Sequence, residues 1–221
     1  MSYSTTRFLT LLAILIIVAG CKNPVKNKQA LTENPAYQSD PSIRKLTERI
    51  EINPQDASLY FDRGNMLRHM RQDTLALLDY KMATKLDSSK AAYYSAVGDL
   101  LFENKDLAGS VVWIQKAIDK DPEDRKARLK IAKLFLYIRK YPEAFEQINI
   151  VLRKDAYNAE GYFLKGMIYK DLKDTAKAIS SFQTAISTAP EYRDALLTVG
   201  LLYCDKKNPI GLKYIDRNSV V

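Results

Sequence analysis

The chain has 221 residues, of which 47% are apolar, so it can bury a sizeable core, and disorder throughout is excluded. Lys and Arg outnumber Asp and Glu by 34 to 26, an excess that attracts acidic partners weakly and says nothing about the fold. Two cysteines, Cys21 and Cys204, and one histidine, His69, are too few for a Cys/His metal site or a Ser-His-Asp triad. No glycine-rich phosphate loop is present either. We therefore expect no metal, no cofactor and no enzyme activity.

The first twenty residues have the pattern of an export signal. An apolar run over residues 8–19 follows a single cation at Arg7, and it is shorter than the ~20 residues that a membrane-spanning helix needs. The run ends in Val18-Ala19-Gly20-Cys21, which resembles the lipobox of bacterial lipoproteins. The resemblance implies that a signal peptide, residues 1–20, is cleaved between Gly20 and Cys21, and that Cys21 is then lipidated.

A multiply acylated cysteine would anchor the chain permanently, because more than one acyl chain is needed for stable membrane binding. The residue after the cysteine is Lys22. In such lipoproteins an Asp at this position favours retention in the inner membrane, so Lys22 favours the outer membrane. Residues 21–41 are polar, contain three prolines and have no helical period, which predicts a flexible tether. The expected location is the cell envelope, anchored by lipid to the outer membrane and facing the periplasm.

A period of 34 residues runs through the rest of the chain. Small residues recur at the twentieth and twenty-seventh positions of each unit, large residues recur at the fourth and eleventh, and prolines recur near position 32. One further position, the eighth, always holds a small residue: Gly64, Gly98, Ala132, Gly166 and Gly200.

This pattern resembles the tetratricopeptide repeat (TPR), a pair of antiparallel helices that approach closely at small residues, with bulky residues filling the space beside them. One pair cannot cover its own apolar face, so neighbouring pairs stack into a right-handed superhelix with a concave groove. The implied fold class is all-α, a TPR solenoid behind a lipoprotein signal peptide. The expected parts are a capping helix at 42–56, repeats at 57–90, 91–124, 125–158 and 159–192, and a partial fifth repeat at 193–221.

The third and last units depart from the pattern. Arg128 stands where the other units have a tyrosine or leucine, and Ala156 replaces the proline, so we expect the third unit to pack more loosely. The last helix, which begins at about Ile210, is not followed by a polar capping helix. Either this end frays, or a partner covers it, or the chain is shorter than its relatives.

The resemblance implies that partners bind in the groove, which is lined by positions 2, 5, 9, 12 and 13 of each first helix. These positions are mixed rather than basic, and Phe61 breaks the Lys/Asn pattern of TPR proteins that clamp a C-terminal carboxylate, so we do not carry that ligand class over. The candidate partner-groove residues are Phe61, Asn65, Ser95, Asp99, Lys126, Leu129, Lys133, Phe163, Met167, Leu197 and Leu201.

Charge is distributed unevenly between the units. The second unit has three basic and seven acidic residues, whereas the third has nine basic and three acidic residues. Five cations between Arg125 and Lys133 could meet an acidic protein, a polyanionic glycan or lipid phosphates. The alternative is a solvated helix face that the acidic neighbouring unit balances.

We expect an anchored scaffold that docks a peptide or helix of another envelope protein and assists assembly or regulation of an envelope complex. The alternative is binding of cell-wall glycan or another anionic polymer by Phe61, Phe102 and Tyr137 together with the basic third repeat. The nearest acid–base pair for an enzyme, Asp99 and Glu103, has nothing that marks it as catalytic. Nucleic acid and small-molecule substrates are not expected, and the oligomeric state is left open.

Two Asp-Thr sequences allow two interpretations. Asp73-Thr74 and Asp174-Thr175 resemble a sequon for O-glycosylation in some envelope bacteria. Asp and Thr are also preferred N-caps of the helix that follows, and we favour this capping role. Glycosylation of Thr74 or Thr175 is left open.

Overall fold

The structure, a computed structural model, describes residues 35–38 and 40–219, and all regular elements within these ranges are α-helices. The signal peptide and Cys21 lie outside the described residues. The helices are α2 (Pro35–Gln38), α3 (Pro41–Ile52), α4 (Ala57–His69), α5 (Asp73–Leu86), α6 (Ala91–Glu103), α7 (Leu107–Lys120), α8 (Arg125–Tyr137), α9 (Tyr141–Lys154), α10 (Ala159–Asp171), α11 (Thr175–Thr188), α12 (Arg193–Asp205) and α13 (Ile210–Ser219).

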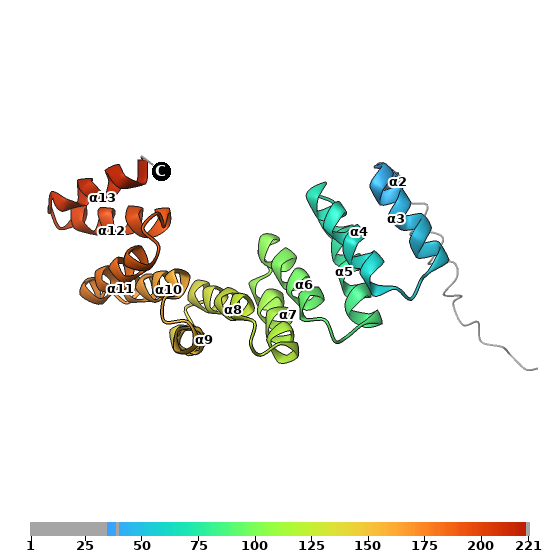
Figure 1. The fold of residues 1–221 in the computed structure, drawn as a ribbon, viewed down its shortest axis with the longest axis horizontal. Helices are drawn as coiled ribbons and strands as arrows, with labels where there is room; N and C mark the ends of the chain where they lie inside the picture. Colours follow the sequence, from blue (N-terminus) through green and yellow to red (C-terminus); the bar gives the residue numbers. More distant parts are fainter. Residues whose placement is uncertain (1–34, 39, 220–221) are drawn as a thin grey trace, which may run out of the picture.

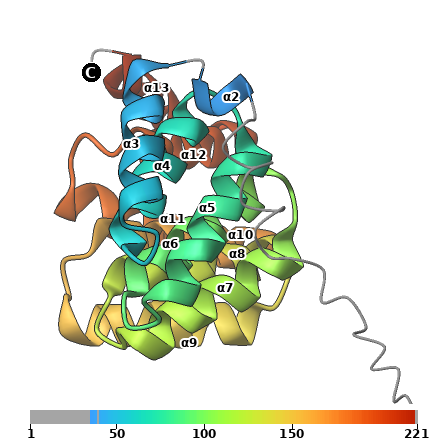
Figure 2. The ribbon, with the colours of Figure 1, turned by 90° about the vertical axis from the view of Figure 1, so that its right-hand side faces the viewer.

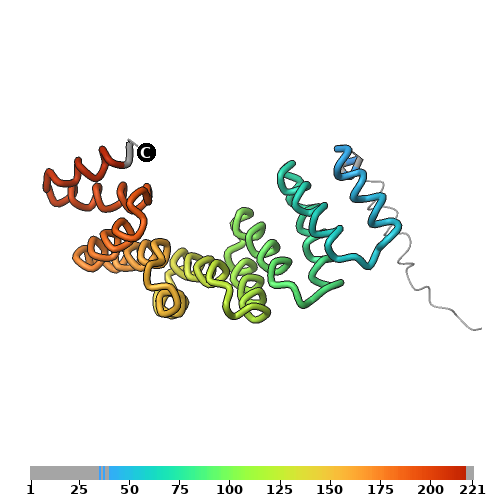
Figure 3. The backbone as a smooth tube through the Cα atoms, in the orientation of Figure 1, coloured from blue at the N-terminus to red at the C-terminus, as the bar shows by residue number. Residues whose placement is uncertain are grey.

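From α4 onward the helices form hairpins: α4–α5, α6–α7, α8–α9, α10–α11 and α12–α13. Each hairpin also packs against the next, and the array curves so that its two ends rise on the same side (Figures 1 and 3). After a quarter turn, α3 stands at the near end of the stack, and α12 and α13 lie behind it (Figure 2). The 34-residue period thus builds a solenoid of helix pairs, as the sequence predicts.

Close packing within each hairpin explains the small residue at the eighth position. A Cβ atom added to Gly98 would lie 2.5 Å from Ile114 Cδ1, and one added to Gly166 would lie 2.6 Å from Phe182 Cε1. Both distances are shorter than a carbon–carbon contact allows. The large residues that fill this space are fully buried, so the glycines set how closely the two helices approach.

Every first helix ends in the same left-handed turn. In the second hairpin, Lys105 N donates to Phe102 O and Asp106 N donates to Leu101 O, the two bonds of a Schellman helix end. The same two bonds recur in the other hairpins. The left-handed residue is an exposed cation in each one: Arg71, Lys105, Arg139, Lys173 and Lys207, with φ between 54 and 65°.

A hydrogen bond to a main-chain carbonyl joins several hairpins to the segment before them. The Tyr94 hydroxyl lies 3.3 Å from the carbonyl oxygen of Ser88, to which it donates. In the third unit Arg128 replaces the tyrosine, and its Nε donates at 2.9 Å to the equivalent carbonyl of Pro122. Its Nη1 also donates to Gln147 Oε1 at 2.7 Å. The guanidinium therefore makes the tyrosine's bond and adds another, and the looser packing expected of the third unit stays a prediction.

The N-terminal end of the array is closed by α2 and α3. Tyr37 in α2 is fully buried, and its ring centroid lies 4.2 Å from the guanidinium carbon of Arg63. Arg63 donates to both carboxylate oxygens of Asp79 and, at 3.1 Å, to Thr47 Oγ1 in α3. The pKa of the Tyr37 hydroxyl is raised to about 12, chiefly by burial and then by the charge of Asp79.

The structure of the N-terminal end contradicts part of the predicted tether. The sequence predicts a flexible segment through residue 41, but residues 35–38 are helical and Tyr37 packs into the folded array. A helix of four residues is too short to show an apolar period, so no periodic pattern could indicate it. The capping helix predicted at 42–56 corresponds to α3, which ends at Ile52.

The two Asp-Thr sequences differ in their capping. Asp174 is the N-cap of α11, and its side chain accepts a hydrogen bond from Lys177 N. Asp73 is already the first residue of α5, and the N-cap residue, Gln72, makes no side-chain capping bond. The capping interpretation is therefore confirmed at Asp174 and wrong at Asp73.

Candidate partner groove

Two adjoining pockets, lined mainly by first helices of the hairpins, share the residue Lys133 of α8. The first, the α6/α8 pocket, has a volume of about 210 Å³. Its charges are partly paired, since Lys130 Nζ donates to Asp99 Oδ2 at 2.6 Å. Its lining residues are Asp99, Phe102, Ser110, Ile114, Lys130, Lys133, Leu134 and Glu160.

The second pocket, the α8/α10 pocket, is larger, with a volume of about 480 Å³ and an apolar base. Two cations, Lys133 and Arg139, come from α8 and the turn that follows it. Two carboxylates, Asp171 and Asp194, come from the end of α10 and the start of α12. The apolar base consists of Leu136, Tyr137, Phe163, Leu164 and Met167.

Part of the predicted groove lines these pockets. Asp99 lines the α6/α8 pocket, Phe163 and Met167 line the α8/α10 pocket, and Lys133 lines both. The remaining C-terminal candidates, which line neither pocket, are Leu197 and Leu201, 40% and 50% exposed on α12. Lys126 is exposed, and Ser95 is half-buried; these two line neither pocket.

Other predicted groove residues contact side chains inside the folded array. Leu129 is only 4% exposed and belongs to the core of the third unit. The Phe61 ring packs against Tyr80 and Tyr93, at centroid distances of 5.7 and 4.9 Å. Asn65 Oδ1 accepts a hydrogen bond from the Tyr80 hydroxyl at 2.8 Å. These side chains are thus positioned by contacts inside the folded array.

Sequence reasoning missed three charged residues of the α8/α10 pocket. Asp171 and Asp194 stand at positions 13 and 2 of their units, which are groove positions, so the repeat pattern could have identified them. Arg139 lies in the turn after α8 and outside those positions, so no sequence signal marked it. The pair Phe102 and Tyr137, named for glycan binding, does meet, with ring centroids 5.6 Å apart.

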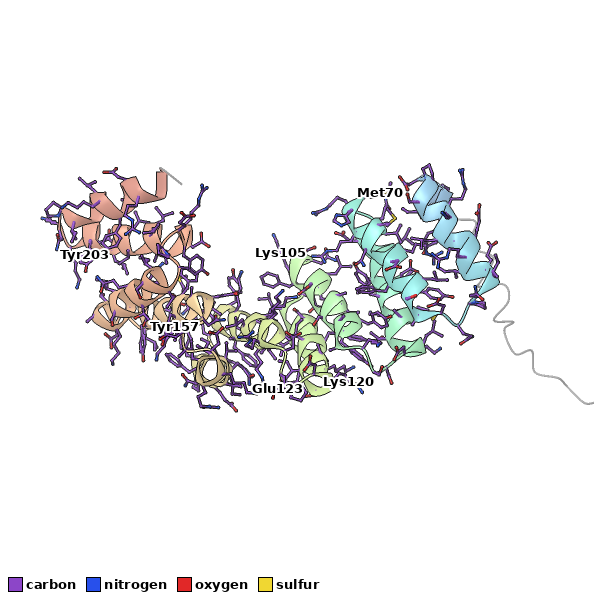
Figure 4. All side chains as sticks on the ribbon, in the orientation of Figure 1. Met70, Lys105, Lys120, Glu123, Tyr157 and Tyr203 are labelled. Carbon is purple, nitrogen blue, oxygen red and sulfur yellow. The ribbon has the colours of Figure 1, made fainter. Side chains whose placement is uncertain are left out.

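Ion pairs between units use several cations of the third unit. Lys130 pairs with Asp99, and Lys154 pairs with Glu123, both carboxylates belonging to the acidic second unit. Figure 4 shows Glu123, a residue of the α7–α8 loop, at the opposite end of the second hairpin from Lys105. These contacts favour the interpretation in which the second unit balances the third, although exposed pairs contribute little stability.

Acidic side chains gather where α10 meets α12. The pKa of the Tyr192 hydroxyl is raised to about 12 by burial and then by the charges of Glu160 and Asp194. Its ring packs on Phe163, a residue of the pocket base, at a centroid distance of 5.1 Å. Two carboxylates, Glu160 and Asp194, therefore lie near Tyr192 at the start of α10 and α12.

The described residues contain neither a metal-binding cluster nor a membrane-spanning helix. Within 35–38 and 40–219, no group of three His, Cys, Asp or Glu side chains is placed to hold a metal ion. None of the helices in the described part of the chain is long and apolar enough to cross a bilayer.

Comparison with known proteins supports the repeat assignment. The family model described as tetratricopeptide repeat matches residues 159–192, the fourth unit. The DnaJ protein P58IPK homolog A of Oryza sativa subsp. japonica is 24% identical over 87% of this chain and 41% of its own length. The DnaJ homolog subfamily C member 7 of Homo sapiens is 25% identical over 80% of this chain and 36% of its own length. This chain thus spans less than half of these relatives.

Solved structures share the fold. A tetratricopeptide repeat protein from Parabacteroides merdae superposes with a TM-score of 0.72 at 16% identity, covering 87% of this chain and 78% of its own. YrrB, described as a TPR protein with an unusual peptide-binding site, has a TM-score of 0.61 at 23% identity, covering 78% of this chain and 90% of its own. At these identities the likeness shows the fold, a TPR solenoid.

Proposed function

We propose that this protein is a lipid-anchored scaffold of the bacterial envelope, whose groove holds a segment of another protein. The α8/α10 pocket is the observation that carries the docking function. It is an open recess of about 480 Å³ that combines an apolar base with four charged residues. The hairpins on either side support it as a curved array, which is the form in which helical repeats present an extended binding surface.

Descriptions of similar proteins support docking of a polypeptide. YrrB is described as having a peptide-binding site. The human mitochondrial import receptor subunit TOM70 is 25% identical over 82% of this chain, and it is named as a receptor. These properties belong to those proteins. For this chain, they favour a polypeptide ligand over a small molecule.

The envelope location is the second part of the proposal, and the lipobox-like sequence that ends at Cys21 supports it. The chain would be held at the membrane by acyl chains on this residue, while the folded array stands away from the surface. Lys22 favours the outer membrane, as argued from the sequence.

Site-directed photo-crosslinking of the full chain in its native membranes tests both parts. A photoreactive residue is placed at Tyr137, 55% exposed at the α8/α10 pocket, or at Val112, 53% exposed on α7 and lining neither pocket. We expect reproducible protein crosslinks from position 137 and few from position 112. Equal yields from the two positions would contradict docking in the groove. Cys21→Ser is expected to move the chain out of the membrane fraction, and its retention there would contradict the anchor.

Glycan binding is the second candidate, and one observation favours it. The paired rings of Phe102 and Tyr137 lie beside Lys133, whose Nζ is 6.0 Å from the Phe102 centroid. Aromatic faces with a nearby cation suit an anionic sugar polymer. Against this, Phe61 packs elsewhere, and several cations of the third unit are already paired. Sedimentation with purified sacculi discriminates the candidates, because the scaffold is expected to stay in the supernatant.

A further inference from the structure

The α8/α10 pocket is lined by two cations and two carboxylates, which come from different units. Its two cations, Lys133 and Arg139, come from the third unit, and its two carboxylates, Asp171 and Asp194, come from the fourth and fifth units. Among the described residues, none of these four side chains has an oppositely charged partner within 4.0 Å. The apolar base lies in the same recess.

Charged residues in neighbouring parts of the array form ion pairs between units. Arg68 and Glu103 pair across the first and second units, and Asp99 and Lys130 pair across the second and third. A charge that is already paired gains little from a ligand, because the ligand must displace an existing partner. A ligand can therefore pair with the four charges of the α8/α10 pocket without breaking an ion pair.

We infer that the α8/α10 pocket selects a peptide segment in which an apolar side chain is flanked by a carboxylate on one side and a cation on the other. This inference rests on the proposed docking function and specifies the chemistry of the partner. The apolar side chain sits on the base beside Phe163 and Met167. The carboxylate faces Lys133 and Arg139, and the cation faces Asp171 and Asp194.

Repulsion gives this arrangement its specificity. A purely acidic segment would bring its second carboxylate against Asp171 and Asp194, and a purely basic segment would bring a cation against Lys133 and Arg139. Either case replaces an attraction with a like-charge contact in a partly desolvated recess, where such contacts cost more than in open water. A mixed segment avoids both contacts.

The test uses the full chain in mild detergent and three fluorescent synthetic peptides. Each peptide has one central Phe in a background of Ala and Gln, flanked by Glu and Lys, by two Glu, or by two Lys. We expect the mixed peptide to bind about tenfold more tightly than either single-sign peptide in fluorescence anisotropy at low salt. The preference is expected to shrink as salt is added.

Charge reversals of the pocket then change the preference in opposite directions. Lys133→Glu with Arg139→Glu is expected to favour the two-Lys peptide, and Asp171→Lys with Asp194→Lys the two-Glu peptide. The matched control is Lys45→Glu with Lys81→Glu, which changes net charge as much as the first variant but alters two exposed residues that do not line the pocket. The control is expected to keep the preference for the mixed peptide. If a reversal unfolds the chain, Lys133→Gln with Arg139→Gln tests the same two cations, with a smaller change expected.

The outcomes separate this inference from the proposed function. If the three peptides bind equally, or if the control shifts the preference as much as the pocket variants do, the charge selection is wrong. Crosslinks at Tyr137 in membranes would still support docking in that case. Loss of both the crosslinks and the peptide preference would overturn the proposed function as well.

Discussion

Arg63 and Asp79 form a buried ion pair near the N-terminal end, with side chains 4% and 5% exposed. The guanidinium donates to both carboxylate oxygens, at 2.7 and 2.8 Å. Burial raises the pKa of Asp79, and the hydrogen bonds from Arg63 oppose this rise. Breaking such a pair by removing one partner is costly, because the other charge stays in the core without compensation.

Arg63→Met is therefore expected to lower the free energy of unfolding by roughly 3 kcal/mol at neutral pH. Without the guanidinium, the pKa of Asp79 rises further, so the folded state binds a proton more readily than the unfolded state. A raised folded-state pKa contributes stability that is present below the unfolded-state pKa and is lost as pH rises through the folded-state pKa. The loss should therefore be smaller near about pH 4 than near pH 7. Urea unfolding at both pH values measures it.

The double variant Arg63→Met with Asp79→Leu provides the control for this pair. It leaves no buried charge, so it is expected to be more stable than Arg63→Met alone at neutral pH. A single-variant loss that is the same at both pH values, or a double variant that is no more stable, would show that the pair does not act through its buried charge.

Within each hairpin, the close approach at the eighth position determines how the two helices pack. In the second unit that position is Gly98, against Ile114. Gly98→Ala gains about 1 kcal/mol of helix propensity, but overpacking a core costs typically ~1–3 kcal/mol. We expect a net loss of stability, with a lower unfolding midpoint in thermal or urea unfolding.

A double-mutant cycle checks the steric origin of that loss. Ile114→Val removes the Cδ1 atom, which would lie 2.5 Å from a Cβ atom at position 98, so the two substitutions are expected to compensate partly. Ser95→Ala, on the same helix and half-buried, is the control and should change stability by less than about 0.5 kcal/mol. Additive effects of Gly98→Ala and Ile114→Val would contradict close packing as the cause.

The hairpins can be predicted from the sequence because each one needs small and large side chains at fixed intervals. These intervals are visible in a single sequence. Features that depend on a single long-range contact are harder to predict from the sequence. Tyr37 is buried against Arg63, far along the chain, and no local pattern shows this. Arg128 breaks the size pattern but keeps the hydrogen bond to Pro122, since a backbone acceptor accepts more than one kind of donor.

The candidate site was predicted in part for a similar reason. Lys133, Phe163 and Met167 fall at regular groove positions and do line the α8/α10 pocket. Leu129 stands at an equivalent position but is buried. The position in the repeat determines the direction in which a side chain leaves the helix, but not how far neighbouring elements cover it. Arg139 enters the pocket from a turn, where the helical period no longer applies.

Over the whole molecule, contacts run from each hairpin to the next, so stability is expected to vary along the array. The N-terminal end is covered by α2 and α3 and includes the buried Tyr37. At the opposite end α13 has no helix beyond it among the described residues, and Ile210 and Leu212 are 39% and 59% exposed. The two ends therefore differ in how much apolar surface they protect.

Native-state hydrogen exchange is expected to show this difference. Amides of α12 and α13 should exchange faster than those of α3 and α4, and amides of α6 to α9 should exchange slowest. Mass spectrometry of peptic fragments measures the order. Faster exchange at α3 and α4 than at α12 and α13 would contradict the closure of the N-terminal end by α2 and α3.

The uniform turn and the carbonyl contact between units also bear on how such a chain evolves. Because the residues that end one hairpin and begin the next have nearly the same backbone dihedral angles in each unit, recombination that inserts or removes one whole 34-residue module leaves the flanking contacts in register. Partial modules would misalign them. Ancestral duplication or loss can thus lengthen or shorten the recognition surface in discrete steps, and the ligand's footprint changes by one hairpin at a time.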